Sequence, residues 1–316
     1  MARIPQVLVG AMVAIFLVAS PAGAVSTIPA YPGDFPDPFV LAAGGRYWAY
    51  STGSAGRNLQ VVSSTDLATW TAPTDPLPVL PAWARPGWTW APGVLAVGGV
   101  YRMYYTARDA ASGRQCVSVA TAASPAGPFT DSSSGPLVCQ LTNGGSIDPS
   151  PFVTSGGTYL QWKSDDNALG RPTYLWSQEL SSDGLSLVGT RAMLLKQDRA
   201  WQAPAIEGPS MYAAGGVYYL FYGAGDWSSV NAAIGYAWCT SPLGPCWNAS
   251  TSGPWMASHG QAIGPSGPGV FTDATGAPRI AYHAWNGTPG YQYGSVRSLW
   301  IDGLRFGYGF SRPSLV

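Results

Sequence analysis

The chain has 316 residues, of which 46% are hydrophobic, 13% aromatic and only 10% charged. Sixteen basic and sixteen acidic residues balance each other and no basic run occurs, which argues against nucleic acid as a partner. The high apolar and aromatic content argues against disorder and indicates a packed protein.

The first 24 residues have the pattern of a secretory signal peptide. Arg3 is followed by an apolar run and then by the small residues Ala22-Gly23-Ala24, which predicts cleavage before Val25. No later segment is apolar for long enough to span a bilayer, so no membrane association is expected after cleavage. We therefore expect a secreted, extracellular protein whose mature chain spans residues 25–316.

A pattern of two short apolar runs around a glycine turn occurs five times in the mature chain. The five segments begin at Asp37, Ala91, Asp148, Glu207 and Gly267, at intervals of 54, 57, 59 and 60 residues. Each of the first four is followed by two further strand-like runs, and no long helical periodicity appears after residue 24. Five units of four strands predict an all-β fold, a five-bladed β-propeller, as a single domain over residues 25–316. Most aromatic side chains would then fill the space between blades.

Three of the five segments begin with an acidic residue. Asp37 lies in FPDPFV, Asp148 in SIDPSPF and Glu207 in AIEGPSM. Because the innermost strand of each blade starts at the mouth of the central channel, the repeat is expected to bring these carboxylates into one pocket. Gathering carboxylates costs free energy through repulsion and desolvation, which favours a shared function over three independent turn caps. Such a cluster in a secreted, aromatic-rich protein indicates glycoside hydrolysis.

The segments DFPDPFV, WAPGV, SIDPSPF and AIEGPSMY, in this order, resemble glycoside hydrolase family 43, whose members have a five-bladed propeller and act on arabinan and xylan. The resemblance runs from about residue 31 to the end of the chain. It implies inverting hydrolysis of α-L-arabinofuranosyl or β-xylosyl linkages in plant cell-wall polysaccharide or oligosaccharide. It also implies that Asp37 is the general base, Glu207 the general acid, and Asp148 the residue that tunes the pKa of the acid and holds it. No cofactor is required for this chemistry.

The same resemblance and the position in the repeat suggest further site residues. Trp90 matches a family segment near the sugar, where an aromatic face can stack on a ring; packing between blades is the alternative. Arg171 and Tyr222 are candidate substrate-binding residues, and Trp227 is a candidate wall of the site. His283 matches a position that helps to hold a central cation, usually calcium, in arabinan-cleaving relatives; a hydrogen-bonded core histidine is the alternative.

The four cysteines predict two disulfides in an oxidising compartment. Three pairings are possible. We favour Cys116–Cys139 and Cys239–Cys246, because each pair is local and falls within one repeat.

Two other functions remain compatible with a five-bladed plan. A fructan- or sucrose-active hydrolase should have Arg-Asp-Pro and Glu-Cys motifs, whereas this chain has Ile147-Asp148-Pro149 and Glu207-Gly208. A non-catalytic carbohydrate-binding propeller would usually lose one of the acids, and all three are present. The sequence leaves open the choice among arabinan, xylan and arabinoxylan, endo or exo action, and the oligomeric state.

Overall fold

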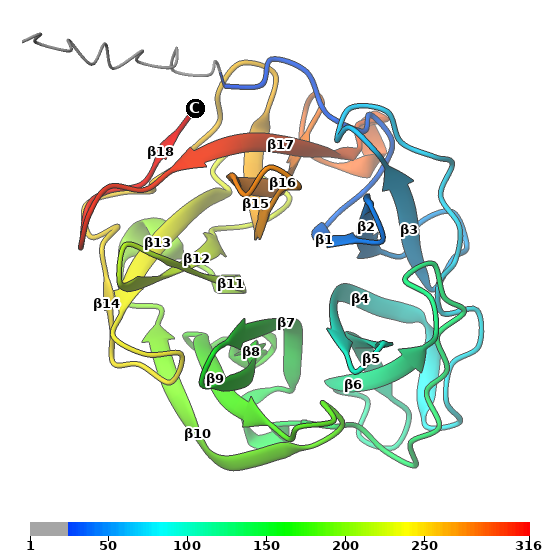
Figure 1. The fold of residues 1–316 in the computed structure, drawn as a ribbon. Coiled ribbons are helices and arrows are strands. Elements are labelled where there is room, and N and C mark those ends of the chain that lie inside the picture. Colours follow the sequence, from blue (N-terminus) through cyan, green and yellow to red (C-terminus); the bar gives the residue numbers. More distant parts are fainter. Residues whose placement is uncertain (1–24) are drawn as a thin grey trace, which may run out of the picture.

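The computed structural model describes residues 25–316, which form five antiparallel sheets around a central axis (Figure 1). The predicted signal peptide, residues 1–24, lies outside the described residues. Helical structure in residues 25–316 consists of four 3-10 turns, Leu141–Asn143, Asp166–Leu169, Ala200–Gln202 and Tyr291–Tyr293. Within this part of the chain, no helix is long and apolar enough to cross a membrane. The all-β, five-bladed propeller expected from the repeat is confirmed.

The strands follow one another outward within each blade, so that the first strand of every blade lies nearest the axis (Figure 1). The first blade contains β1 (Phe39–Ala43), β2 (Arg46–Thr52) and β3 (Leu59–Ser64), and the second contains β4 (Ala84–Val97), β5 (Val100–Asp109) and β6 (Gln115–Ala122). The third contains β7 (Ser146–Thr154), β8 (Gly157–Ser164), β9 (Tyr174–Leu180) and β10 (Leu187–Lys196). The fourth contains β11 (Ile206–Ala214), β12 (Val217–Ala224), β13 (Ala233–Cys239) and β14 (Cys246–Asn248). The fifth contains β15 (Ile263–Thr272), β16 (Pro278–Trp285), β17 (Arg297–Arg305) and β18 (Ser314–Leu315).

The expectation of four strands in every blade is wrong for the first two blades. Each has a three-stranded sheet, and isolated bridges such as Val61 to Thr74 and Val117 to Val138 stand where a fourth strand would run. The segments after β3 and β6 carry several prolines, including Pro73, Pro76 and Pro128. Because proline cannot donate to a ladder, these segments follow the blade edge without forming a continuous strand.

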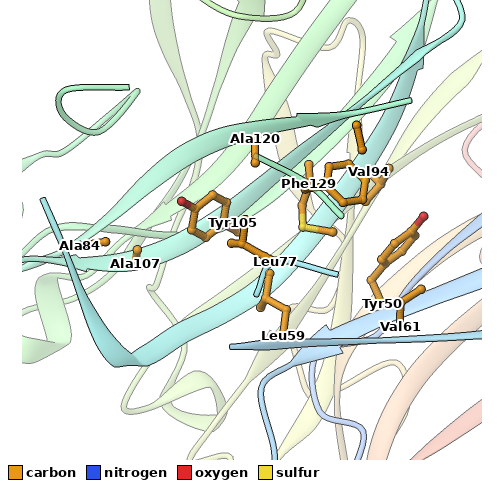
Figure 2. Packing of buried hydrophobic residues seen from close by; sticks show 12 residues of the cluster. Tyr50, Leu59, Val61, Leu77, Ala84, Val94, Tyr105, Ala107, Ala120 and Phe129 are labelled. Carbon is orange, nitrogen blue, oxygen red and sulfur yellow. The ribbon is translucent and has the colours of Figure 1, made fainter. Parts of the chain in front are cut away.

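Hydrophobic clusters fill the spaces between neighbouring blades, one cluster to each of the five interfaces. Between the first and second blades, Tyr50 and Leu59 pack against Val94, Tyr105 and Phe129 (Figure 2). Burial of each large apolar side chain stabilises the fold by about 1.5–3 kcal/mol. Since every cluster takes side chains from two blades, a blade buries its faces only when its neighbours are in place.

The ring closes between the first and fifth blades through the segment that precedes β1. Tyr31 and Leu299 of β17 exchange two main-chain hydrogen bonds of 3.2 and 3.1 Å. Phe35 adds a third main-chain bond of 2.7 Å to Arg297, and its fully buried ring packs in a cluster with Phe271 and Leu299. Contacts between residues far apart in the sequence therefore complete the propeller.

Both expected disulfides are present. Cys116 of β6 is bonded to Cys139 in the segment that leads to β7, and Cys239 of β13 is bonded to Cys246 of β14. The pairing of local cysteines within one repeat is confirmed, and each disulfide fastens an outer segment to the strand beside it.

Candidate active site

The innermost strand of every blade carries an irregularity at the same place. The residue before a proline has a positive φ, between 43° and 59°, in all five blades: Asp37, Ala91, Asp148, Gly208 and Gly267. In blades two to five, the pairing with the second strand slips by one residue at this point. Left-handed backbone costs a residue with a side chain about 1–2 kcal/mol. This backbone conformation is retained at Ala91 as well as at Asp37 and Asp148, and at the two aspartates it sets the direction in which the carboxylate leaves the strand.

Glu207 does not occupy the position of Asp37 and Asp148. It stands one residue earlier, before Gly208, and pairs with Gly223 as Ile147 pairs with Lys163. The expectation that the three acids begin their segments at matched positions is therefore wrong by one residue. The glutamate leaves the strand from the residue before the bulge, and its longer side chain still reaches the same space.

The three acids meet in one pocket of about 460 Å³ at the axis, which Asp37, Asp148 and Glu207 line together. A narrower space of about 40 Å³, lined by Asp37, Ala91, Asp148 and Gly208 and by prolines of all five blades, adjoins it. A larger pocket of about 680 Å³ lies near both ends of the described chain, beside Trp255 and Arg312, but its lining contains no carboxylate. The three acids converge as the repeat implied, so the axial pocket is the candidate active site.

Asp37 is held from three sides. Its Oδ2 accepts a hydrogen bond from the hydroxyl of Thr52, and its main-chain N–H donates to Nδ1 of His283 at 2.9 Å. The guanidinium of Arg297 lies 3.8 Å from Oδ1 and supplies positive charge to the carboxylate. Arg297 is itself fixed, because its guanidinium carbon lies 4.6 Å from the ring centre of Trp227.

The same arrangement recurs around the ring. Thr52 Oγ1 also accepts the N–H of Ala91 at 2.8 Å, and Thr106 Oγ1 accepts the N–H of Asp148 at 3.1 Å. In each case a side chain from the second strand of one blade binds the bulge residue of the next. Adjacent blades are thus joined at the level of the carboxylates, which fixes the distances among them.

Asp148 lies among the other charges of the pocket. Its Oδ2 accepts the main-chain N–H of Gly208 at 3.0 Å. Burial and the negative charge of Glu207 raise the pKa of Asp148 to about 8, and Asp37 adds to the effect, although the ammonium of Lys163 and the Gly208 hydrogen bond oppose it. The acids therefore retain a proton near neutral pH, and that proton belongs to the cluster rather than to one residue.

Lys163 of β8 supplies the positive charge beside Glu207. Its Nζ lies 3.1 Å from Oε2 of Glu207 and 3.4 Å from Oδ1 of Asp165, and its side chain is only 1% exposed. Sequence reasoning missed Lys163, as it missed Thr52 and Arg297. A usable signal was present in YLQWKS, where a lysine interrupts an apolar strand next to a tryptophan, because lysine is seldom fully buried without a partner.

Tyr222 is not a substrate-binding residue in this structure. Its side chain is fully buried in the cluster between the third and fourth blades and does not line the pocket. The hydroxyl accepts a hydrogen bond from Gln202 Nε2 at 3.0 Å and donates to Asn248 Oδ1 at 2.8 Å. Its strand position turns the ring toward the neighbouring blade, so the prediction of a site role is wrong.

Arg171 also lies outside the pocket lining. Its guanidinium is 2.9 Å from Asp166 and donates to the carbonyl oxygen of Thr142, while 48% of the side chain remains exposed. The residue ties the turn after β8 to the turn before β7. The structure does not bring Arg171 into the axial pocket, and substrate binding by this residue stays a prediction.

Two tryptophans predicted near the sugar do line the pocket, Trp90 from the second blade and Trp227 from the loop after β12. Trp227 stacks on Trp285 with ring centres 6.2 Å apart and keeps 42% of its surface exposed. Beside Trp90, Trp88 lies with ring centres 6.0 Å apart on a stretch of β4 that continues beyond the pocket. Exposed aromatic faces at a polar pocket suit sugar rings, which present apolar C–H faces and hydroxyl edges.

His283 is a buried, neutral histidine. Burial and the nearby charge of Arg297 lower its pKa well below the ordinary value, and Nδ1 accepts the N–H of Asp37. The other ring nitrogen, Nε2, has no hydrogen-bond partner within residues 25–316. Calcium prefers six to eight oxygen ligands, and the described residues contain no group of three or more His, Cys, Asp and Glu placed to bind a metal. A cation beside His283 would therefore be bound by one nitrogen of the protein and otherwise by water molecules. The binding of such a cation stays a prediction.

The sequence matches the family described as glycosyl hydrolases family 43 over residues 26–307. A protein of Aspergillus clavatus named probable arabinan endo-1,5-alpha-L-arabinosidase A is 26% identical over 280 residues, covering 81% of this chain and 83% of that protein. The beta-D-galactofuranosidase xynD of Aspergillus niger is 28% identical over 233 residues, covering 69% and 64%. A crystal structure of a thermostable family-43 glycoside hydrolase superposes with a TM-score of 0.77 at 28% identity, covering 89% of this chain and 92% of that one. Because the match spans nearly all of the described chain, the protein belongs to glycosyl hydrolases family 43.

Proposed function

We propose that this protein is an inverting glycosidase that hydrolyses α-L-arabinofuranosyl linkages of the arabinan type, or β-xylosyl linkages, in plant cell-wall polysaccharide. The observation that carries the proposal is the meeting of Asp37, Asp148 and Glu207 in one axial pocket. Two carboxyl groups with different protonation states are what glycoside hydrolysis needs.

Asp37 acts as the general base. It takes a proton from a water molecule whose oxygen attacks the anomeric carbon from the face opposite the leaving group. Thr52 and Arg297 support this role, because the hydroxyl donates a hydrogen bond to the carboxylate and the guanidinium lies 3.8 Å from it, which fixes its position. Inversion requires base and acid to stand about 6.5–9.5 Å apart, with the water between the base and the sugar.

Glu207 acts as the general acid. Its proton passes to the glycosidic oxygen while the bond from that oxygen to the anomeric carbon breaks and its electron pair stays on the oxygen. Asp148 supports the acid in two ways. Its carboxyl group holds the proton of the acid cluster jointly with Glu207, and its hydrogen bond to Gly208 holds the backbone next to Glu207.

The pocket supports recognition of a furanose ring in an oligomer. Trp90 and Trp227 offer aromatic faces at its wall. Relatives include proteins named arabinan endo-1,5-alpha-L-arabinosidase and beta-D-galactofuranosidase, both of which point to five-membered sugar rings. We propose arabinan-type substrates first, with xylan and arabinoxylan as the other members of the test panel.

We also propose that the protein acts outside the cell. The signal-peptide pattern of residues 1–24 and the two disulfides support secretion. Mass spectrometry of the secreted protein should find an amino terminus at Val25.

Product analysis tests the proposed function. Purified protein is incubated with arabinan, arabinoxylan and xylan, and the anomer first released is followed by proton NMR. Release of arabinose-containing products with inverted configuration is expected from the wild type and not from Glu207→Gln. Retained configuration would rule out the mechanism, and binding of arabinan without sugar release from either protein would identify a carbohydrate-binding propeller instead.

A further inference from the structure

The ammonium of Lys163 is buried beside Glu207, the proposed general acid. At this position it stabilises the glutamate little before the proton is donated and most strongly after the proton has left. It contacts Oε2 of Glu207 at 3.1 Å, and the Glu207 side chain is 20% exposed toward the pocket while that of Lys163 is 1% exposed. Both residues line the axial pocket, but the glutamate keeps the larger exposed fraction there and is the more accessible of the two to a substrate. An ammonium at this distance stabilises the ionised carboxylate more than the protonated carboxyl group.

We propose that Lys163 is a positioning residue for proton donation: its ammonium binds the Glu207 carboxylate that forms when the proton passes to the leaving oxygen. The inference rests on the proposed function, because it takes Glu207 as the proton donor. A donor stabilised in its ionised form is a stronger acid, and it speeds the departure of sugar alkoxides, which leave poorly without a proton.

The charges that face Lys163 keep it an ammonium. Glu207 approaches from β11, Asp148 from β7 and Asp165 from the turn after β8. Burial alone would lower the pKa of Lys163, but these three carboxylates outweigh burial and raise that pKa above its ordinary value. Farther out, Asp37 and Arg297 complete the charged groups of the pocket. Lys163 thus stays charged throughout the pH range of the reaction.

Asp165 competes with Glu207 for the same ammonium, at 3.4 Å against 3.1 Å. Removal of the Asp165 charge is therefore expected to strengthen the effect of Lys163 on Glu207, and removal of Lys163 to abolish it. These two changes should move the alkaline limb of the pH–rate profile in opposite directions, because that limb reports loss of the proton that the acid cluster holds.

The test compares two substrates of one sugar, 4-nitrophenyl α-L-arabinofuranoside and 1,5-α-arabinotriose, over a range of pH. In Lys163→Met, kcat/KM on arabinotriose should fall roughly tenfold or more, whereas the aryl substrate, whose phenolate leaves without much help, should lose far less. The alkaline limb should move to higher pH. Lys196→Met, the same substitution at an exposed lysine of β10, is the matched control and should match wild type.

Equal losses on the two substrates, or an unmoved alkaline limb, would overturn the inference, since a merely structural lysine would affect both substrates alike. If Lys163→Met does not fold, Asp165→Asn decides the question: its alkaline limb should move to lower pH, and no movement or the opposite movement refutes the role. Glu207→Gln separates the two levels of the argument. A loss confined to arabinotriose supports Glu207 as the donor, and equal losses on both substrates would refute the proposed function itself.

Discussion

Oδ2 of Asp148 in the third blade accepts the main-chain N–H of Gly208 in the fourth at 3.0 Å, directly beside Glu207. The bond ties the positions of two acids to the packing of two blades. It also makes Asp148 part of the structure as well as of the chemistry, so a change at this residue should alter stability and activity together.

Asp148→Asn should make the protein less sensitive to alkaline pH. Burial and Glu207 raise the pKa of Asp148 to about 8 in the folded protein, compared with about 3.9 in an unfolded chain. The stability that this proton contributes is fully present below about pH 4 and is lost as the pH rises through about 8. Asparagine keeps the acceptor for Gly208 without the charge, so the variant should gain about 1–3 kcal/mol relative to wild type at high pH.

Thermal unfolding at pH 5 and pH 9 measures this difference. Asp198→Asn changes an aspartate that is 49% exposed and serves as the control, with no change in pH dependence expected. If the Tm of Asp148→Asn depended on pH as strongly as the Tm of the wild type, the raised pKa of Asp148 would be contradicted. Activity of Asp148→Asn should nevertheless fall, because Glu207 loses the carboxyl group with which it shares the proton of the acid cluster.

Asp37→Asn should abolish hydrolysis of aryl and sugar leaving groups alike. Attack by water needs the base whichever group departs, and loss of a positioned base costs on the order of 10²–10⁴-fold. Steady-state kinetics on both substrates gives the measurement. The folded structure should persist, since asparagine can still accept the Thr52 hydroxyl bond and keeps the main-chain donor to His283. A loss confined to the sugar leaving group would assign Asp37 to proton donation instead.

The variants Tyr222→Phe and Trp227→Ala should distinguish a residue of the hydrophobic core from a residue of the substrate pocket. Loss of the Tyr222 hydroxyl leaves Gln202 Nε2 without its hydrogen-bond acceptor and removes one of the two donors to Asn248 Oδ1, which should lower the free energy of unfolding by about 1–3 kcal/mol with KM unchanged. Trp227→Ala should instead raise KM for arabinotriose by about tenfold, equivalent to about 1.4 kcal/mol. Trp227→Phe keeps an aromatic face over Arg297 and should retain most of the affinity. A raised KM in Tyr222→Phe would instead show that Tyr222 contributes to substrate binding.

The predicted central cation can be tested without an activity assay. If His283 Nε2 is its protein ligand, calcium should raise the Tm of chelator-treated protein through preferential binding to the folded state. His283→Asn, which can still accept the N–H of Asp37, should abolish that rise. The absence of any calcium-dependent change in the wild-type Tm would remove the cation from the account.

The family match bears on the alternatives that the sequence left open. A fructan- or sucrose-active hydrolase is not supported, because the chain matches glycosyl hydrolases family 43 over residues 26–307. The relatives' names keep the enzymatic interpretation ahead of a purely carbohydrate-binding one, and release of sugar decides between them.

Sequence periodicity was enough to place Asp37 and Asp148 in one pocket, because equivalent residues of a closed ring converge on its axis. It failed at Glu207 by one residue, since the residue before the proline marks the equivalent position in each blade, and in the fourth blade that residue is Gly208 and not the acid. It failed at Tyr222 for another reason: a strand's alternation shows that a side chain points to a face, but the packing of the neighbouring blade decides what that face meets.

The order of the chain alone determined the number of blades, the local disulfides and the gathering of acids, because each follows from a repeat read along the sequence. Only the tertiary structure decided which second-strand side chains serve those acids. Thr52, Lys163 and His283 stand at the same place in three blades, yet each contacts a different group of the next blade: the N–H of Ala91, the carboxylate of Glu207 and the N–H of Asp37. Contacts between blades depend on how the sheets pack against one another. A local sequence pattern does not show which residue of the next blade a side chain will contact.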